Sequence, residues 1–179
     1  MGWEFEFLDF IRGHFSGGLT DKIMLFITHC GDKGYIWIAA ALVMCTSKKY
    51  RRCGITLIFG LLAGVLVGNV LLKNIVCRER PCWIRELDEL LIAVPRDYSF
   101  PSGHTLSSFL AASVIVCRHK LTGIIAFVIA TLIAFSRMYL YVHFPTDIIG
   151  GAVIGSAVGL AAVFVAEKYF FRSRLGQKI

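Results

Sequence analysis

The chain alternates long apolar segments with short polar connections. Six apolar segments lie at about residues 19–30, 34–47, 54–77, 103–117, 121–142 and 146–170. A helix that spans a bilayer needs about 20 apolar residues, and the third, fifth and sixth segments reach that length. The other three have about 12–15 residues, so they would have to extend into their flanks, tilt or thin the bilayer. The pattern predicts an all-α fold in which six transmembrane helices form a compact bundle.

The N-terminal segment, residues 1–17, has a different pattern. Trp3, Phe7, Phe10 and Ile11 fall roughly on one face of a helix. This arrangement is typical of an amphipathic helix that lies in the membrane interface. A helix packed against the rest of the protein would explain the same pattern equally well.

The composition indicates a membrane protein with a single domain, residues 1–179. Hydrophobic residues make up 56% of the chain, above the roughly 45–50% of soluble domains. The net charge is +7. The basic residues lie between the apolar segments, which favours a role in membrane topology over nucleic-acid binding.

The basic clusters predict the orientation in the cell membrane. They are 48-KKYRR-52, 118-RHK-120 and, near the C-terminus, Lys168, Arg172, Arg174 and Lys178. The positive-inside rule places all three in the cytoplasm. With six spans both termini are then cytoplasmic, and the connections at 78–102 and 136–146 are extracytoplasmic. If segment 19–30 does not cross, only the N-terminus moves to the outside.

Three polar clusters lie at the extracytoplasmic ends of the predicted spans. In 73-KNIVCRERP-81, Lys73 and Arg80 are seven residues apart and would share one helix face. Pro81 predicts that this helix ends at Arg80. Basic residues are also common at the ends of membrane helices, where they reach toward water.

The second cluster, 101-PSGH-104, opens an apolar segment. Ser102 is a good N-cap, and Gly103 lets the backbone approach a ligand closely. The first amides of such a helix form an anion site, with His104 beside it. An ordinary capped helix with an incidental histidine is the alternative for this cluster alone.

The third cluster is 136-SRMYLYVHFPTD-147. It places Arg137 at the end of a span, His143 in the following connection and Asp147 in the first turn of the next helix, which Thr146 could cap. A histidine near a carboxylate is the pair that supports nucleophilic catalysis. Asp147 could also be a plain helix-start acid.

Taken together, the three clusters predict one site. Cations and helix amides suit a phosphate, and two histidines suit a nucleophile and a general acid. The chain offers no acidic cluster that would hold Mg²⁺. We therefore expect phosphoryl transfer that needs neither metal nor cofactor.

The motifs K-x6-RP, PSGH and SR-x5-H-x3-D resemble the three signatures of the type 2 phosphatidic acid phosphatase superfamily, in the same order and at similar separations. The resemblance implies that His143 is a nucleophile forming a phosphohistidine, that Asp147 orients it, and that His104 is the general acid. It further implies a phosphate pocket made of Lys73, Arg80, Ser102, Gly103 and Arg137.

The resemblance also implies a function. We expect a lipid phosphate phosphatase of the membrane branch, similar to bacterial members that act on undecaprenyl pyrophosphate or phosphatidylglycerol phosphate, with its active site outside the cytoplasm. A lipid phosphotransferase and a non-catalytic lipid-binding scaffold are the alternatives. The expected partners are the lipid substrate and membrane lipids, with no nucleic acid.

Two structural questions stay open at this level. Gly151, Gly155 and Gly159 form a small-residue face that suits close helix packing, either within the chain or in a homodimer. Cys77 and Cys82 lie on one connection and could pair only if it is extracytoplasmic.

Overall fold

The structure is a computed structural model that describes residues 2–85 and 90–171. Within these ranges every regular element is a helix, which agrees with the predicted all-α fold. The elements are α1 (Gly2–Phe15), α2 (Gly18–Cys30), η1 (Asp32–Gly34), α3 (Tyr35–Thr46), α4 (Arg51–Gly64), η2 (Val65–Leu72), α5 (Lys73–Val76), α6 (Pro81–Ile84), α7 (Gly103–Val116), α8 (Lys120–Tyr139), α9 (Pro145–Val165) and η3 (Ala166–Phe171).

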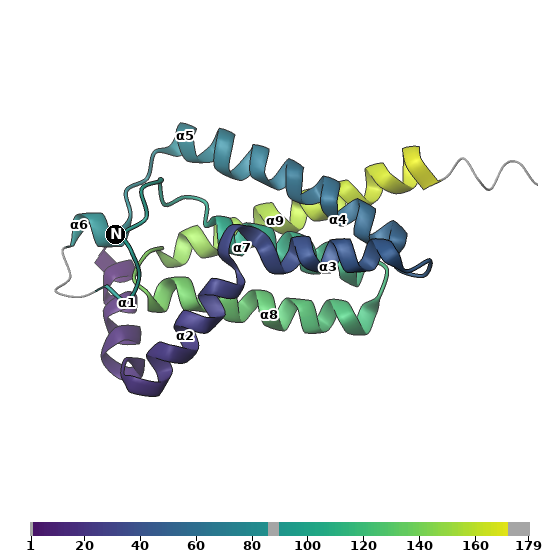
Figure 1. Cartoon of the computed structure of the whole chain (residues 1–179). Helices are drawn as coiled ribbons and strands as arrows, with labels where there is room; N and C mark the ends of the chain where they lie inside the picture. Colours follow the sequence, from purple (N-terminus) through teal and green to yellow (C-terminus); the bar gives the residue numbers. More distant parts are fainter. Residues whose placement is uncertain (1, 86–89, 172–179) are drawn as a thin grey trace, which may run out of the picture.

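The helix α7 forms the centre of an elongated bundle. It packs against α8 and α9 along most of its length, and α4 covers a further side (Figure 1). The contact with α9 is close because of glycine: a Cβ atom at Gly155 would lie 2.3 Å from the carbonyl oxygen of Leu106. Gly151 and Gly159 meet the backbone of α7 in the same way. The small-residue face is therefore used within the chain.

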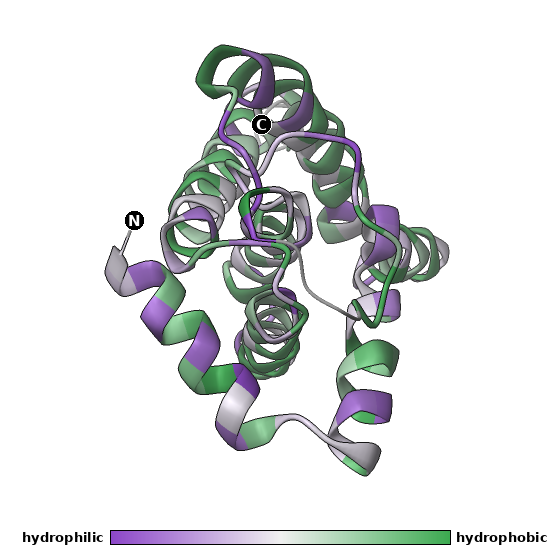
Figure 2. Cartoon of the chain, turned by 90° about the vertical axis from the view of Figure 1, so that its left-hand side faces the viewer, coloured by the Kyte–Doolittle hydropathy of each residue, from purple (hydrophilic) through white to green (hydrophobic). Residues whose placement is uncertain are grey.

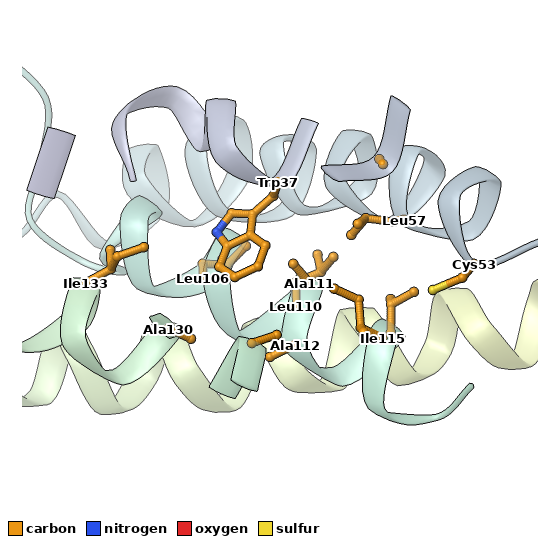
Figure 3. Packing of buried hydrophobic residues seen from close by; sticks show 13 residues of the cluster. Trp37, Cys53, Leu57, Leu106, Leu110, Ala111, Ala112, Ile115, Ala130 and Ile133 are labelled. Atoms are coloured by element: carbon orange, nitrogen blue, oxygen red, sulfur yellow. The ribbon is translucent and has the colours of Figure 1, made fainter. Parts of the chain in front are cut away.

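The apolar core lies around α7 (Figure 3). Leu110 and Ile115 of α7 are buried among side chains that include Trp37 of α3, Leu57 of α4 and Ile133 of α8. The indole nitrogen of Trp37 donates a hydrogen bond to the hydroxyl of Ser108 at 2.9 Å. This bond satisfies the polar end of the tryptophan, so the ring can be buried at little cost.

Three stretches are long and apolar enough to cross a membrane: Arg51–Ile84, Lys120–Tyr139 and Pro145–Phe171. The helix α7 is apolar but shorter. The outer surfaces carry many exposed apolar side chains, among them Phe59 and Val153, which are 58% and 63% exposed. Surfaces of this kind suit hydrocarbon rather than water.

The path of the N-terminal half differs from the predicted six spans. Along α2, Asp21 contacts Tyr139, Thr28 contacts Arg137, and Gly31 packs on Ile133. The helix α2 therefore runs antiparallel to α8, and α3 continues in the same direction.

The break between α2 and α3 lies at η1, where Lys33 and Gly34 have φ values of 49° and 71°. Because the chain kinks there but does not reverse, α2 and α3 make one pass along the bundle. The described chain thus makes five passes: α2 with α3, α4 with η2 and α5, then α7, α8 and α9.

The helix α1 lies across one end of the bundle, roughly perpendicular to the long helices (Figures 1 and 2). Phe5, Leu8 and Ile11 are buried on its inner face, whereas Trp3 and Phe7 are exposed. The prediction that Ile11 shares a face with Trp3 was wrong: Ile11 points to the protein.

The three basic clusters meet at the opposite end, as far as the structure describes them. The Tyr50 and His119 rings lie 4.4 Å apart, and Arg118 pairs with Glu167 at 2.7 Å. Arg172, Arg174 and Lys178 lie outside the described residues. Since α1 and η3 occupy opposite ends, the N-terminal and C-terminal ends of the described chain do not lie together. This differs from the prediction for two cytoplasmic termini.

Candidate active site

The turn between α8 and α9 holds His143 and Asp147. The chain leaves α8 through Tyr141, which has a φ of 59°, and Pro145 begins α9. The Asp147 carboxylate reaches back, and its Oδ2 atom accepts the backbone N–H of Phe144 at 2.8 Å. Asp147 therefore caps the helix. The prediction that Thr146 caps it was wrong, because the Thr146 hydroxyl is bonded to Glu4.

His143 is 1% exposed and lies between a carboxylate and a cation. Its Nδ1 atom lies 3.6 Å from Asp147 Oδ2 and 3.4 Å from the hydroxyl of Ser99, which itself donates to that carboxylate at 2.5 Å. On the other side, Arg80 lies 3.1 Å from Nε2. A guanidinium only donates, so Nε2 is the unprotonated nitrogen and the proton is on Nδ1.

The protonation state of His143 follows from this setting. Burial, and then the charge of Arg80, lower the pKa of His143 well below its usual value. The ring is thus neutral near pH 7, with the free electron pair of Nε2 facing the guanidinium and the cavity.

Lys73 and Arg80 lie close together, but the prediction that they share one helix was wrong. The helix α5 ends at Val76, Cys77 has a φ of 49°, and Arg80 is extended. The Asp97 carboxylate joins the two cations: it accepts from the Arg80 guanidinium at 2.8 Å and also pairs with Lys73. Although burial pushes the pKa of Asp97 upward, Lys73 and Arg80 lower it to about 2.

Arg137, near the end of α8, is also buried at this end. One guanidinium nitrogen donates to the Thr28 hydroxyl at 2.6 Å. Its Nε atom is buried, and among the described residues it has no hydrogen-bond partner. Buried donors are rarely left unpaired, so this atom is suited to meet a ligand.

The start of α7 supplies Ser102, Gly103 and His104, as predicted. The Ser102 hydroxyl caps the helix by accepting the backbone N–H of Thr105 at 3.5 Å. His104 Nε2 lies 2.9 Å from Asp32 Oδ1 of η1. Gly31 lies against the same ring, where a Cβ atom would be 2.8 Å from His104 Cδ2.

A cavity of about 540 Å³ lies among these groups. The polar part of its lining includes Lys73, Arg80, Asp97, Gly103, His104, Arg137 and His143. Ser102 and Asp147 are fully buried beside it. The remainder is largely apolar and is formed by α3, α4, η2 and α7, with Ile38, Ile58, Leu61, Leu62, Val65, Leu106 and Leu110.

Several residues of the site were not found from the sequence. They are Glu4, Asp32, Asp97 and Ser99, and their partners are far away in the chain. Arg78 also contacts the site: its guanidinium donates to Asp147 Oδ1 at 2.7 Å. Its position between Lys73 and Arg80 was the feature of the sequence that could have indicated a place near the site. Cys77 and Cys82 are both free thiols in this structure.

Comparisons with known proteins agree with this arrangement. The sequence model of the PAP2 superfamily matches residues 54–171. An undecaprenyl-diphosphatase of Sulfolobus acidocaldarius is 32% identical over 79% of this chain and 68% of its own length. Phosphatidylglycerophosphatase B of Bacillus subtilis is 32% identical over 75% of this chain and 70% of its own length.

Two solved structures share the fold. The PAP2-type phosphatidylglycerolphosphate phosphatase of Bacillus subtilis superposes with a TM-score of 0.74 at 25% identity, covering 95% of this chain and 87% of that one. LpxE of Aquifex aeolicus gives a TM-score of 0.79 at 27% identity, covering 89% and 94%.

Proposed function

The chain belongs to the PAP2 superfamily and is a membrane lipid phosphatase, and we propose that it acts through a phosphohistidine formed on His143. The observation that carries this proposal is the position of His143 Nε2. It is unprotonated and fully buried, and it faces the cavity that Arg80, Arg137 and His104 also line. An unprotonated ring nitrogen surrounded by cations is suited to attack on a phosphorus atom.

In the first step, His143 Nε2 attacks phosphorus and forms a P–N bond while the bond to the leaving oxygen breaks. His104 donates a proton to that oxygen. Lys73, Arg80, the Arg137 Nε–H and the backbone N–H at Gly103 stabilise the charge on the phosphoryl oxygens, where preorganised donors act most strongly. Asp147 stabilises the charge that develops on the His143 ring.

In the second step, neutral His104 takes a proton from water, and the hydroxide attacks the phosphohistidine. The P–N bond breaks, inorganic phosphate forms, and His143 returns to its neutral state. Before the first step, phosphate has to displace Asp97 from Lys73 and Arg80, because that carboxylate occupies the same cations.

The apolar half of the cavity supports a lipid substrate. Its side chains on α3, α4 and η2 are suited to an apolar tail that enters from the bilayer between these helices. The relatives named above act on undecaprenyl diphosphate and on phosphatidylglycerophosphate. We propose one of these lipids as the substrate of this chain.

We further propose that the active-site end faces the outside of the cell. The basic clusters at the other end are the basis, through the positive-inside rule. With five passes this orientation puts α1 on the outer surface, where Trp3, Phe7 and Phe10 would lie in the membrane interface. Residues 1–179 would then form one membrane-embedded domain.

Phosphate release by the purified protein in detergent tests the proposal. The substrates are undecaprenyl pyrophosphate, undecaprenyl phosphate, phosphatidylglycerol phosphate and phosphatidic acid, each with excess chelator. We expect release from at least one of the two proposed lipids, and at least a thousandfold loss, on the order of known nucleophile substitutions, in His143→Ala. Equal release by parent and variant would rule out the histidine mechanism.

A further inference from the structure

A chain of buried polar contacts links α1 to Asp147. The Arg78 guanidinium donates to Asp147 Oδ1 at 2.7 Å and to Glu4 Oε2 at 2.7 Å. The Thr146 hydroxyl bonds to both Arg78 and Glu4. Glu4 is only 4% exposed. It lies outside residues 54–171, which the superfamily model matches.

Packing fixes this linkage in place. The Phe5 and Phe144 rings meet edge to face at 5.2 Å, and Leu8 of α1 is fully buried. The Arg78 guanidinium lies 4.3 Å from the centre of the Phe144 ring. Phe144 directly follows His143, so α1 packs against the turn that carries the nucleophile.

Both oxygens of Asp147 are thereby held. Oδ2 accepts from Phe144 N–H and Ser99, and Oδ1 accepts from Arg78. A carboxylate with both oxygens bonded cannot rotate away from His143.

The charges in this cluster give Glu4 a second role. Arg78 alone would cancel the charge of Asp147, which His143 needs when its ring becomes cationic. The Glu4 carboxylate on the far side of Arg78 offsets that cation, so the three groups together keep one net negative charge. Arg85, the next cation near α1, is paired with Asp9 at 2.8 Å.

We propose that Glu4 and Arg78 are positioning residues, through which α1 sets the orientation and the effective charge of Asp147. The inference rests on the proposed roles of His143 and Asp147. It makes the N-terminal helix, which the superfamily model does not match, a part of the catalytic machinery.

The test is Glu4→Gln in the full-length protein, with Glu6→Gln as the matched control. Both substitutions replace a glutamate of α1 by glutamine. Glu6 is exposed, so its substitution does not affect the contact with Arg78. We would measure kcat, KM, the melting temperature and the pH dependence of kcat/KM on the best lipid substrate.

We expect Glu4→Gln to lower kcat by about tenfold, on the order of one lost charge interaction, with KM changed by less than about twofold. The acid limb of kcat/KM should also move to lower pH. His143 faces Arg80, Lys73 and Arg137 on its other side, so a weaker negative charge at Asp147 makes its ring harder to protonate. Glu6→Gln should match the parent.

An unchanged kcat in Glu4→Gln would overturn the inference, and so would a lower melting temperature with an unmoved acid limb. If Glu4→Gln is too unstable to assay, Glu4→Asp replaces it as the test. This variant retains the negative charge, so we expect the acid limb of the parent, and a shifted limb would overturn the inference. Loss of activity in His143→Ala with normal Glu4→Gln would refute this inference alone. An active His143→Ala would refute the proposed function, and this inference with it.

Discussion

The environment of His143 explains how a buried histidine can be a nucleophile. Burial and the Arg80 guanidinium favour the neutral ring, while Asp147 and Ser99 lie at the protonated nitrogen. The site therefore holds the ring in the tautomer that presents an electron pair at Nε2. No proton has to be removed before attack.

The lowered pKa of His143 predicts a specific pH dependence. If the imidazole had the ordinary pKa of about 6.5, only about a tenth of it would be neutral at pH 5.5. Because only the neutral ring attacks, a lowered pKa keeps it competent as pH falls through that range. We expect kcat/KM for p-nitrophenyl phosphate, whose leaving group needs no acid, to stay nearly level between pH 7.5 and 5.5 after correction for ionisation of the substrate. An acid limb centred at or above pH 6.5 would contradict this.

The pair of Asp32 and His104 makes a prediction about the leaving group. A carboxylate 2.9 Å from His104 Nε2 holds the ring in place and offsets part of the cost of charging it in a buried position. We expect Asp32→Asn to slow hydrolysis of an alkyl phosphate by about tenfold to a hundredfold, within the range of general-acid effects. The kcat/KM for p-nitrophenyl phosphate, which reports only the phosphorylation step, should change by less than about threefold, since p-nitrophenolate leaves without a proton. Equal losses on both substrates would argue against an acid role for this pair.

At the residue scale, some members of the site carry a signal in the sequence and others carry none. The motifs predicted His143, Asp147, His104 and the phosphate cations, and the structure places these residues at one end of the bundle. Asp32 and Asp97 were missed, since each pairs across the fold with a partner in another segment. Single charged residues in loops carry no signal of such long-range contacts.

At the scale of elements, the packing of α9 on α7 positions the site. The carbonyl oxygen of Ser102 lies against Gly151, and the Ser102 amide bonds to the Asp147 carbonyl at 3.2 Å. The glycine spacing predicted close packing without naming the neighbour, and the structure assigns it to α7.

Gly155→Ala tests that contact. The added Cβ would lie 2.3 Å from a backbone oxygen of α7 that cannot move away like a side chain. We expect a loss of about 1–3 kcal/mol, typical of overpacking, seen as a lower melting temperature in detergent. Ala157→Val is the control, because Ala157 is exposed on the same helix. If both variants melt like the parent, the helices are less closely packed than described.

The course of two other segments could not be predicted, because it depends on the backbone conformation of single residues at their ends. The run from Lys73 to Arg80 is compatible with a helix in sequence, but Cys77 turns it and aims Arg80 back at the cavity. The segments 19–30 and 34–47 look like two short spans. The direction of one relative to the other depends on the kink at Lys33 and Gly34, and the hydropathy pattern does not predict such a kink.

At the scale of the whole molecule, the bundle has a catalytic end and a basic end. Native cysteines mark both: Cys77 is exposed at the catalytic end and Cys117 at the basic end. In intact cells a membrane-impermeant maleimide should label Cys77 and should reach Cys117 only after permeabilisation. Cys77→Ser and Cys117→Ser assign the two signals. Labelling of Cys117 alone before permeabilisation would reverse the proposed orientation.

The most direct test of the account is to trap the phosphohistidine. In His104→Ala, p-nitrophenyl phosphate can still phosphorylate the protein, because its leaving group needs no acid, whereas water lacks its base. Mixing should release a burst of p-nitrophenol equal to the enzyme present, and mass spectrometry of the quenched protein should place an acid-labile phosphate on His143. A burst with phosphate on another residue, or turnover with no covalent phosphate, would contradict the central claim.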